Sequence, residues 1–176
     1  MYGLSQGLMG AACLLYGASQ TFENKNRVFY YLFWIGYNAL LVAHYYCLEA
    51  YTAAWLNLLT FSVMLLVGVL MRFRKMALSY LLLTVSITAS VVIAILTWDT
   101  WLSLLPMFAA IICFLINSFE SIYVKMFGTI AIYVLEVIYL VFFASWVGVV
   151  FESISLALAI FGLVMFLWGK HAENSI

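Results

Sequence analysis

The chain has 176 residues, of which 68% are hydrophobic and only 8% are charged, and its formal net charge is zero. A soluble globular domain has roughly a quarter of charged residues, so a water-soluble fold of this composition would expose large apolar patches. A bilayer accepts apolar side chains on every face of a helix, and the composition therefore predicts an integral membrane protein. The zero net charge excludes a basic surface for nucleic acid.

The spacing of apolar residues distinguishes helices from a transmembrane β-barrel. Barrel strands alternate apolar and polar residues over roughly ten positions. Stretches such as Ser62 to Met71 and Tyr80 to Leu96 are apolar at both odd and even positions. Since backbone groups in lipid must be satisfied within a helix or a closed barrel, the fold class is predicted to be all-α.

Seven apolar segments follow one another along the chain, each close to the ~20 residues that cross the hydrocarbon core. They are predicted at about 3–21, 28–47, 53–71, 77–97, 102–118, 126–146 and 147–169. The breaks between them are short. The last break, around Ser145 to Gly148, is the weakest, and the alternative is one merged final segment.

The basic residues predict the orientation of these segments. With seven crossings, every Lys and Arg falls on one side of the membrane, whereas Glu49 and Asp99 lie in loops on the other side. The basic residues are Lys25, Arg27, Arg72, Arg74, Lys75, Lys125 and Lys170. Because positive loops stay in the cytoplasm, we expect the N-terminus outside and the C-terminus inside, which requires an odd number of crossings.

The segments also show a three-plus-one-plus-three organisation. The division is a first three-helix bundle over 1–76, a linker helix over 77–97, and a second bundle with a short cytoplasmic tail over 98–176. Asn57 and Glu152 lie near the start of the third helix of each bundle, 95 positions apart (152 − 57). A single linker helix makes two triplets of helices parallel rather than inverted.

Helix-breaking and small residues suggest how the bundles pack and move. Gly10 and Pro106 interrupt the first helix of each bundle and are candidate hinges for alternating access, with static packing as the alternative. Gly3 and Gly7 place small residues on one helix face, which predicts close helix packing.

Several short stretches carry a family resemblance. They are Gly7-Leu8-Met9-Gly10, Leu48 to Asn57, Leu104-Leu105-Pro106, and Ala144 to Gly148 ahead of Glu152. The layout resembles that of the triple-helix-bundle transporters, the SWEET and PnuC carriers, and the stretches look like the YgjV-type bacterial inner-membrane proteins. The resemblance implies a multi-pass protein of the bacterial inner (plasma) membrane.

The resemblance to SWEET-like carriers also implies a pocket. In those carriers, a polar residue from the third helix of each bundle lines the pocket, and these positions correspond to Asn57 and Glu152. In those carriers an aromatic residue about 18 positions earlier caps the pocket. The corresponding positions here, 39 and 134, adjoin Asn38 and Tyr133, so only Tyr133 supplies an aromatic ring. The Pro-Gln pair of those carriers is absent, which argues against sugar as the substrate.

Two glutamates interrupt the apolar segments. Glu136 lies near the middle of the sixth segment, where an ionised carboxylate costs about 2.5 kcal/mol or more unless it is paired, protonated or hydrated. Glu152 lies inside the seventh segment. Each is a candidate proton carrier or substrate anchor, and the alternative is a neutral acid that hydrogen-bonds a neighbouring helix.

Three further polar side chains have a structural alternative. Asn38 and Asn57 are candidate substrate ligands, although such residues often join neighbouring helices. His44, near the outer end of the second segment, is expected to contact water or Glu49 at the interface rather than to sense pH. The cysteines Cys13, Cys47 and Cys113 lack the spacing of a disulfide framework or a metal site, so we expect no metal and no cofactor.

The favoured function is a facilitator or secondary transporter of a small polar solute, which binds near Asn57, Glu152, Glu136, Asn38 and Tyr133. The alternative is a non-transporting membrane scaffold or partner subunit. An enzyme is not expected, because catalytic residue types are scattered singly along the segments. The expected surroundings are the lipid bilayer, with a homo-oligomer as a further possibility.

Overall fold

The computed structural model describes the backbone of residues 1–22 and 27–173, and the side chains of residues 1–21 and 29–168. Lys25 and the side chains of Arg27 and Lys170, three of the predicted orientation signals, lie outside this part. Every regular element of the described chain is a helix. The elements are α1 (Tyr2–Phe22), α2 (Arg27–Cys47), α3 (Tyr51–Arg72), α4 (Met76–Leu96), the 3-10 turn η1 (Trp101–Ser103), α5 (Leu104–Ser118), α6 (Ile122–Phe142) and α7 (Trp146–Glu173).

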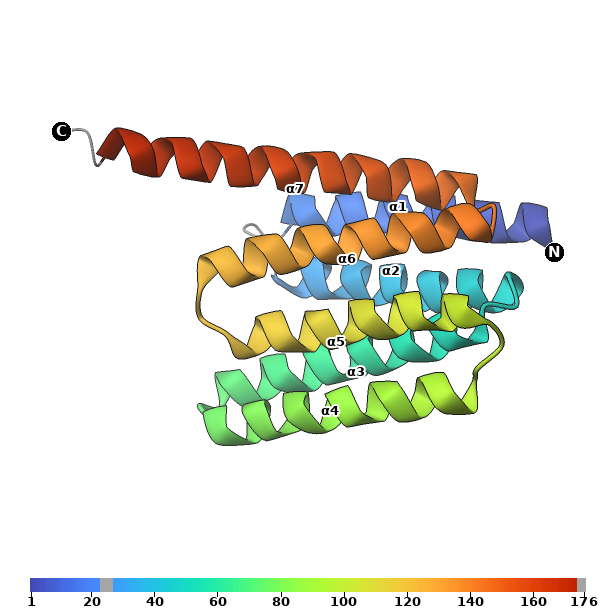
Figure 1. Cartoon of the computed structure of the whole chain (residues 1–176), viewed down its shortest axis with the longest axis horizontal. Helices are drawn as coiled ribbons and strands as arrows, with labels where there is room; N and C mark the ends of the chain where they lie inside the picture. Colours follow the sequence, from blue (N-terminus) through green and yellow to red (C-terminus); the bar gives the residue numbers. More distant parts are fainter. Residues whose placement is uncertain (23–26, 174–176) are drawn as a thin grey trace.

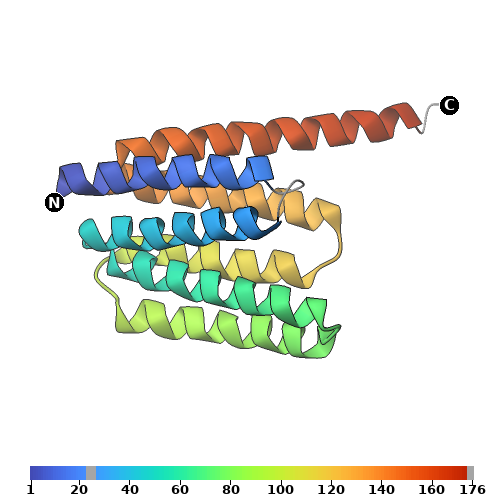
Figure 2. The same cartoon turned by 180° about the vertical axis from the view of Figure 1, so that it is seen from behind.

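The helices form two layers, which Figures 1 and 2 show from opposite sides. One layer consists of α1, α2 and α3, and the other consists of α5, α6 and α7, with neighbours in sequence packed side by side. Contacts of α1 with α7 and of α3 with α5 join the layers along their two edges. Helix α4 packs against α3 and α5 and covers that edge (Figure 1).

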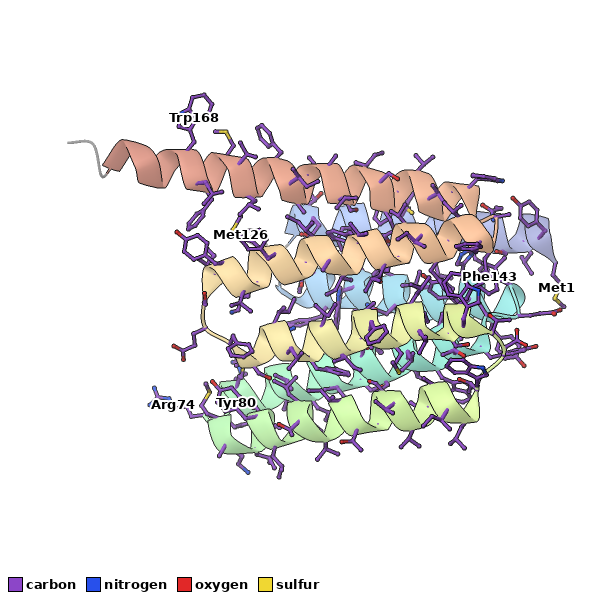
Figure 3. All side chains as sticks on the ribbon, in the orientation of Figure 1. Met1, Arg74, Tyr80, Met126, Phe143 and Trp168 are labelled. Carbon is purple, nitrogen blue, oxygen red and sulfur yellow. The ribbon has the colours of Figure 1, made fainter. Side chains whose placement is uncertain are left out.

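The alternation of the helices gives the molecule two ends (Figure 1). The N end contains Met1 and the connections after α2, α4 and α6, whereas the C end contains the connections after α3 and α5 and the last residues of α7. Arg74 lies at the C end and Phe143 at the N end (Figure 3). The described basic side chains, Arg72, Arg74, Lys75 and Lys125, all belong to the C end, together with Glu120.

Five of the described helices are long and apolar enough to cross a bilayer. They are α3, α4, η1 with α5, α6, and α7. Helices α1 and α2 have 21 residues each, the same length as α4 and α6, so length does not set them apart. They are less apolar because α1 carries Gln6 and Gln20 and α2 carries Asn38 and His44. A multi-pass helical membrane protein is therefore confirmed, whereas crossings by α1 and α2 stay a prediction.

The boundary between the last two helices differs from the predicted one. The sequence indicated a break between residues 146 and 147, but α6 ends at Phe142 and α7 begins at Trp146. Ala144 adopts a φ of 51°, and the Ser145 N–H donates to the Leu140 carbonyl at 2.9 Å. This is the bonding of a left-handed helix C-cap, a position at which glycine is usual. The sequence analysis placed the break around Ser145 to Gly148, but Gly148 lies in the first turn of α7.

The turn between α2 and α3 has the same geometry. Glu49 adopts a φ of 59°, and the Ala50 N–H donates to the Tyr45 carbonyl at 3.0 Å. Each residue of one turn has its counterpart in the other 95 positions away. This holds for the capping residues (144 − 49), for the N–H donors (145 − 50) and for the carbonyl acceptors (140 − 45). Asn57 and Glu152, at the same spacing, therefore occupy equivalent positions in α3 and α7.

Two clusters of buried apolar side chains hold the layers together. One joins α1, α2, α3 and α6 near the N end, and the other joins α3, α4 and α5. Small residues allow close approach at Gly128 of α6, where an added Cβ would overlap the Cγ2 of Ile116 in α5. A Cβ at Gly3 or Gly7 would meet no atom within 4 Å, so the prediction that these two glycines permit close packing is wrong.

Candidate functional site

A cavity of about 90 Å³ lies between the two layers. Helices α2, α3, α5 and α6 each contribute to its wall. The polar groups of the wall are Tyr45, Asn57, Thr60, Cys113, Glu136 and Tyr139. Ligand sites for larger molecules usually measure about 300–1,000 Å³, so in this conformation the space suits a few waters or a very small solute.

Three of the residues selected from the sequence meet at this cavity. Asn57 of α3, Pro106 of α5 and Glu136 of α6 all line its wall. The Nδ2 of Asn57 donates to the Ala53 carbonyl of its own helix at 3.0 Å, which fixes the orientation of the amide. The cavity thus combines an amide with a carboxyl group in an otherwise largely apolar wall.

Glu136 supplies the one carboxyl group among the described residues that line the cavity. An isolated carboxylate in an apolar interior is costly, so the group requires a proton, a bound partner or water. The described Lys and Arg side chains lie at the C end and in its connections, away from this wall. Glu136 can therefore take up a proton, a cation or a hydrogen-bond donor from whatever enters the cavity.

Glu152 of α7 lies outside the wall of this cavity. Its side chain is 4% exposed, and its Oε2 has no hydrogen-bond partner in the described part of the chain. Cys13, Tyr37 and Tyr133 lie within electrostatic range of its carboxyl group. These residues belong to α1, α2 and α6, and the Tyr16 ring of α1 packs against that of Tyr37, with 5.1 Å between the ring centroids. Glu152 of α7 thus belongs to a second polar cluster, which lies between these four helices.

Tyrosines connect this second cluster with the cavity. Tyr37 and Tyr45 both lie within electrostatic range of Glu136 and of Glu152, and Tyr45 also lines the cavity. Tyr45 packs against Tyr139, another residue of the wall, with a distance of 6.0 Å between the ring centroids. The two acids thus lie near the same two tyrosines, which together with Tyr139 we call the tyrosine seam, although only Glu136 lines the cavity.

The remaining predicted residues are placed apart from the cavity. The Nδ2 of Asn38 donates to the Trp34 carbonyl of its own helix at 2.8 Å, and Asn38 is not part of the wall. Tyr133 belongs to the Glu152 cluster. Gly10 lies in α1, where a Cβ would meet no atom within 4 Å. The structure therefore brings Asn57, Glu136 and Pro106 together at the cavity, whereas Glu152, Tyr133 and Asn38 lie outside its wall.

A buried histidine joins the two layers at the N end. His44 is fully buried, with Nδ1 2.8 Å from the Ser5 carbonyl and Nε2 3.1 Å from the Ser145 Oγ. Because a carbonyl only accepts, Nδ1 carries the proton and donates to Ser5, and Nε2 accepts from the Ser145 hydroxyl. The expectation that His44 contacts water or Glu49 at the interface is wrong.

Two further bonds strengthen this connection, which we call the His44 clasp. The Tyr2 hydroxyl donates to the Ala144 carbonyl at 2.8 Å, and the Val147 N–H donates to Gln6 Oε1 at 3.1 Å. The clasp thus ties α1 and α2 to the turn between α6 and α7. Sequence analysis missed it because Ser5 and Ser145 lie 39 and 101 positions from His44.

A second group of hydroxyls closes the other edge of the N end. Thr52 at the start of α3 donates to the Thr97 carbonyl after α4 at 2.8 Å. The Thr52 hydroxyl is also 2.9 Å from the Thr97 hydroxyl and 3.2 Å from the Ser103 hydroxyl of η1. Together with the His44 clasp, these bonds join neighbouring elements at the N end, where Thr52, Thr97 and Ser103 also line a small hollow of about 20 Å³.

The fold and the cavity define a multi-pass helical membrane protein with a small polar space between two helix layers. A family model, Imp-YgjV, described as "Bacterial inner membrane protein", matches residues 3–168. The chain belongs to this family, and it is a multi-pass protein of the bacterial inner membrane. Neither a curated protein nor a solved structure matches the chain.

Proposed function

We propose that the chain is a facilitator or secondary transporter of a small polar solute and that the solute binds between the two helix layers. The observation that carries this proposal is the shared cavity of Asn57 and Glu136, two polar side chains from different layers. Polar residues are expensive within a membrane, and those that face a common cavity mark solute and ion pathways. The proposal assigns no catalysis to the chain.

The proposed topology is seven crossings with the N-terminus outside, arranged as the bundle 1–76, the linker helix 77–97 and the bundle 98–176. The turns at Glu49 and Ala144 support an internal repeat, since they lie 95 positions apart and at the same step of each proposed bundle. Their bonding alone is less specific, because the turn at Arg74 has it too. Gathering of the described Arg and Lys side chains at the C end supports a cytoplasmic C end. This layout is similar to that of SWEET and PnuC carriers.

In this proposal, Asn57 and Glu136 contact the solute, and Tyr133 and Glu152 act through the tyrosine seam. Asn38 is the weakest of the proposed ligands, because its amide bonds to its own helix outside the wall. Gly10 and Pro106 are the proposed hinges. Pro106 lies in the cavity wall and in the first turn of α5, beside η1, so a change of the angle between η1 and α5 there changes the width of the cavity.

The proposed cycle treats the conformation described here as the one with a closed N end. The His44 clasp and the Thr52–Thr97 group connect neighbouring elements above the cavity at that end. Separation of these contacts opens the cavity toward the N end, and their formation closes it. Rocking of one layer against the other then exposes the cavity to the two sides in turn.

Uptake into proteoliposomes tests the proposal. The purified chain is reconstituted, and osmotic shrinkage and re-swelling are followed by light scattering for a panel of small neutral, cationic and anionic solutes. We expect at least one solute to enter faster than into empty vesicles. We also expect Glu136→Gln to slow that entry at least about tenfold, because a hydrogen bond to a charged group is worth about 1.5–3 kcal/mol.

Exposed acids provide the matched control. Glu49→Gln and Asp99→Asn remove one carboxylate each from the exposed loops of the N end and should leave entry within a factor of two of the parent chain. Equal slowing by Glu136→Gln and by the loop variants would argue against a role for the cavity. Entry no faster than into empty vesicles for every solute would reject the transport proposal.

The alternative function is a non-transporting scaffold or partner subunit. The small volume of the cavity favours it, because the space is far below that of most ligand sites. This alternative expects no solute flux and a stoichiometric membrane partner that is recovered after mild cross-linking. The uptake assay therefore separates the two functions directly.

A further inference from the structure

A second hollow lies on the outer face of α2 and α3 at the C end, apart from the cavity between the layers. It is an open groove of about 680 Å³ whose floor and sides include Tyr31, Trp34, Leu65, Gly68 and Arg72. Its residues on α3 recur at intervals of three to four positions, so they form one stripe about two turns long, or roughly 12 Å. The groove is therefore elongated along the helix axes.

Two features give the groove its shape. Gly68 supplies no side chain, and a Cβ there would meet no atom within 4 Å, so the space above it is open. Trp34 packs against Phe61 of α3, with 5.2 Å between the ring centroids, and this pair closes the groove toward the N end. What remains is an apolar channel that is open toward the surroundings of the protein.

The part of the groove at the end of α3 carries positive charge. Arg72 is the last residue of α3, and Arg74 and Lys75 follow in the exposed turn before α4. Helix α3 has 22 residues and thus spans roughly 33 Å, about the thickness of the hydrocarbon core. Arg72 therefore lies at the level of the lipid headgroups, with the exposed Tyr31 at the same end of the groove.

We propose that this groove is a binding site for an anionic phospholipid. One acyl chain lies in the apolar channel over Gly68 and against Trp34, and the phosphate of the headgroup pairs with Arg72. Guanidinium binds phosphate through two parallel hydrogen bonds, which an ordinary apolar helix surface cannot offer. Lipid is favoured over a second parallel copy, because two copies would bring their Arg72, Arg74 and Lys75 side chains together.

Fluorescence quenching of Trp34 tests the proposal on the full-length chain. The other five tryptophans are replaced by phenylalanine, and the protein is reconstituted in neutral lipid with increasing brominated phosphatidylglycerol or brominated phosphatidylcholine. We expect half-maximal quenching of Trp34 at about a fivefold lower fraction of the anionic lipid, the preference expected from one basic residue at the headgroup level. Arg72→Gln should remove this preference.

Matched variants separate the groove from general charge and from helix effects. Lys125→Gln removes an exposed positive charge at the same end but outside the groove, and it should retain the preference. Gly68→Leu fills the channel and should lower quenching by both lipids at least twofold, whereas Gly162→Leu, also in open space on α7, should not.

The outcomes decide the proposal in either direction. Equal quenching by the two lipids, or a preference that survives Arg72→Gln, overturns it. Protection of Trp34 from both lipids in a dimeric fraction also overturns it, because a second copy then occupies the groove. Arg72 is exposed, so Arg72→Gln remains decisive if Gly68→Leu fails to fold, and folding is checked by circular dichroism and gel filtration.

Discussion

His44 and Ser145 are joined by a hydrogen bond of 3.1 Å between the imidazole Nε2 and the hydroxyl Oγ, although 101 positions separate them in the chain. The other imidazole nitrogen bonds to the Ser5 carbonyl at 2.8 Å. One fully buried ring thus connects α1, α2 and the turn before α7. Since the two helix layers meet here, the stability of the N end depends on this ring.

Replacement of His44 by alanine should destabilise the fold. The change removes a fully buried ring and leaves the Ser145 hydroxyl buried without its partner, which costs about 1–3 kcal/mol. It also removes the side-chain bond to the Ser5 carbonyl, which keeps its place in helix α1. We expect a loss of about 2–4 kcal/mol in the free energy of unfolding, measured by titration with a denaturing detergent. Asn117→Ala, which removes an exposed amide bonded only within α5, should cost less than about 1 kcal/mol. Equal losses for both variants would contradict the role of the clasp.

Loss of the clasp should also expose the cavity. Cys113 lies in the cavity wall, so its reaction with N-ethylmaleimide reports access to that space. In a chain with Cys13→Ser and Cys47→Ser, we expect Ser145→Ala to speed the labelling of Cys113 by about fivefold, because one net hydrogen bond is worth about 1 kcal/mol and shifts the open population accordingly. The measurement is the rate of labelling followed by mass spectrometry.

Thr84→Ala provides the control for this labelling experiment. Its hydroxyl bonds to the Tyr80 carbonyl within α4 and is exposed, so its loss removes one hydrogen bond but no contact between the layers. The rate at Cys113 should then stay within a factor of two of the parent chain. If both variants increase the rate equally, labelling reflects general loosening of the fold and not opening of the N end.

The helical membrane fold could be predicted because composition and segment length are properties of local sequence. The bounds of α4, Met76–Leu96, agree with the predicted 77–97 to within one residue. The predicted boundary between α6 and α7 was wrong because the helix is terminated by Ala144 in a left-handed conformation, which alanine rarely adopts. The predicted break, around Ser145 to Gly148, includes the first residues of α7. Comparison with the turn at Glu49, 95 positions earlier, contained the missing signal.

The candidate site could be predicted only in part. Glu136 and Asn57 were selected because each is polar in an apolar helix, and that local property led to the cavity wall. Which polar residues share a cavity depends on packing between layers, and Glu152 faces a different cluster despite its equivalence to Asn57. The partners of His44 were beyond prediction for the same reason, since nothing local to Ser5 or Ser145 marks them.

Packing between α5 and α6 should depend on the absence of a side chain at residue 128. A Cβ at Gly128 overlaps Cγ2 of Ile116, and a branched side chain in a helix has little rotamer freedom to move away. Gly128→Ala should therefore lower the free energy of unfolding by about 1–3 kcal/mol, the usual cost of overpacking. The measurement is again a denaturing-detergent titration.

Two further variants identify the cause of that loss. Gly162→Ala also adds a Cβ within a helix, but into open space, and should be neutral or stabilising by up to about 1 kcal/mol. Ile116→Ala removes the overlapping group and should recover most of the stability when it is combined with Gly128→Ala. A double variant no more stable than Gly128→Ala alone would show that the steric explanation is wrong.

Labelling of single cysteines in cells should distinguish seven crossings from five. In a chain without its native cysteines, seven crossings with the N-terminus outside predict that Glu49→Cys and Asp99→Cys react with a membrane-impermeant maleimide. Arg74→Cys and Glu120→Cys should react only after permeabilisation. All four positions are exposed, so lack of reaction reports the membrane and not burial.

Asn24→Cys is the position that decides the number of crossings. If α1 and α2 cross the bilayer, residue 24 lies on the cytoplasmic side and stays unlabelled in intact cells, which agrees with the predicted role of Lys25 and Arg27 as cytoplasmic charges. If only the five more apolar helices cross, residue 24 lies on the same side as residue 49 and reacts. Labelling of Asn24→Cys together with Glu49→Cys would therefore reduce the transmembrane part to α3–α7 and remove the basis for two three-helix bundles within the membrane.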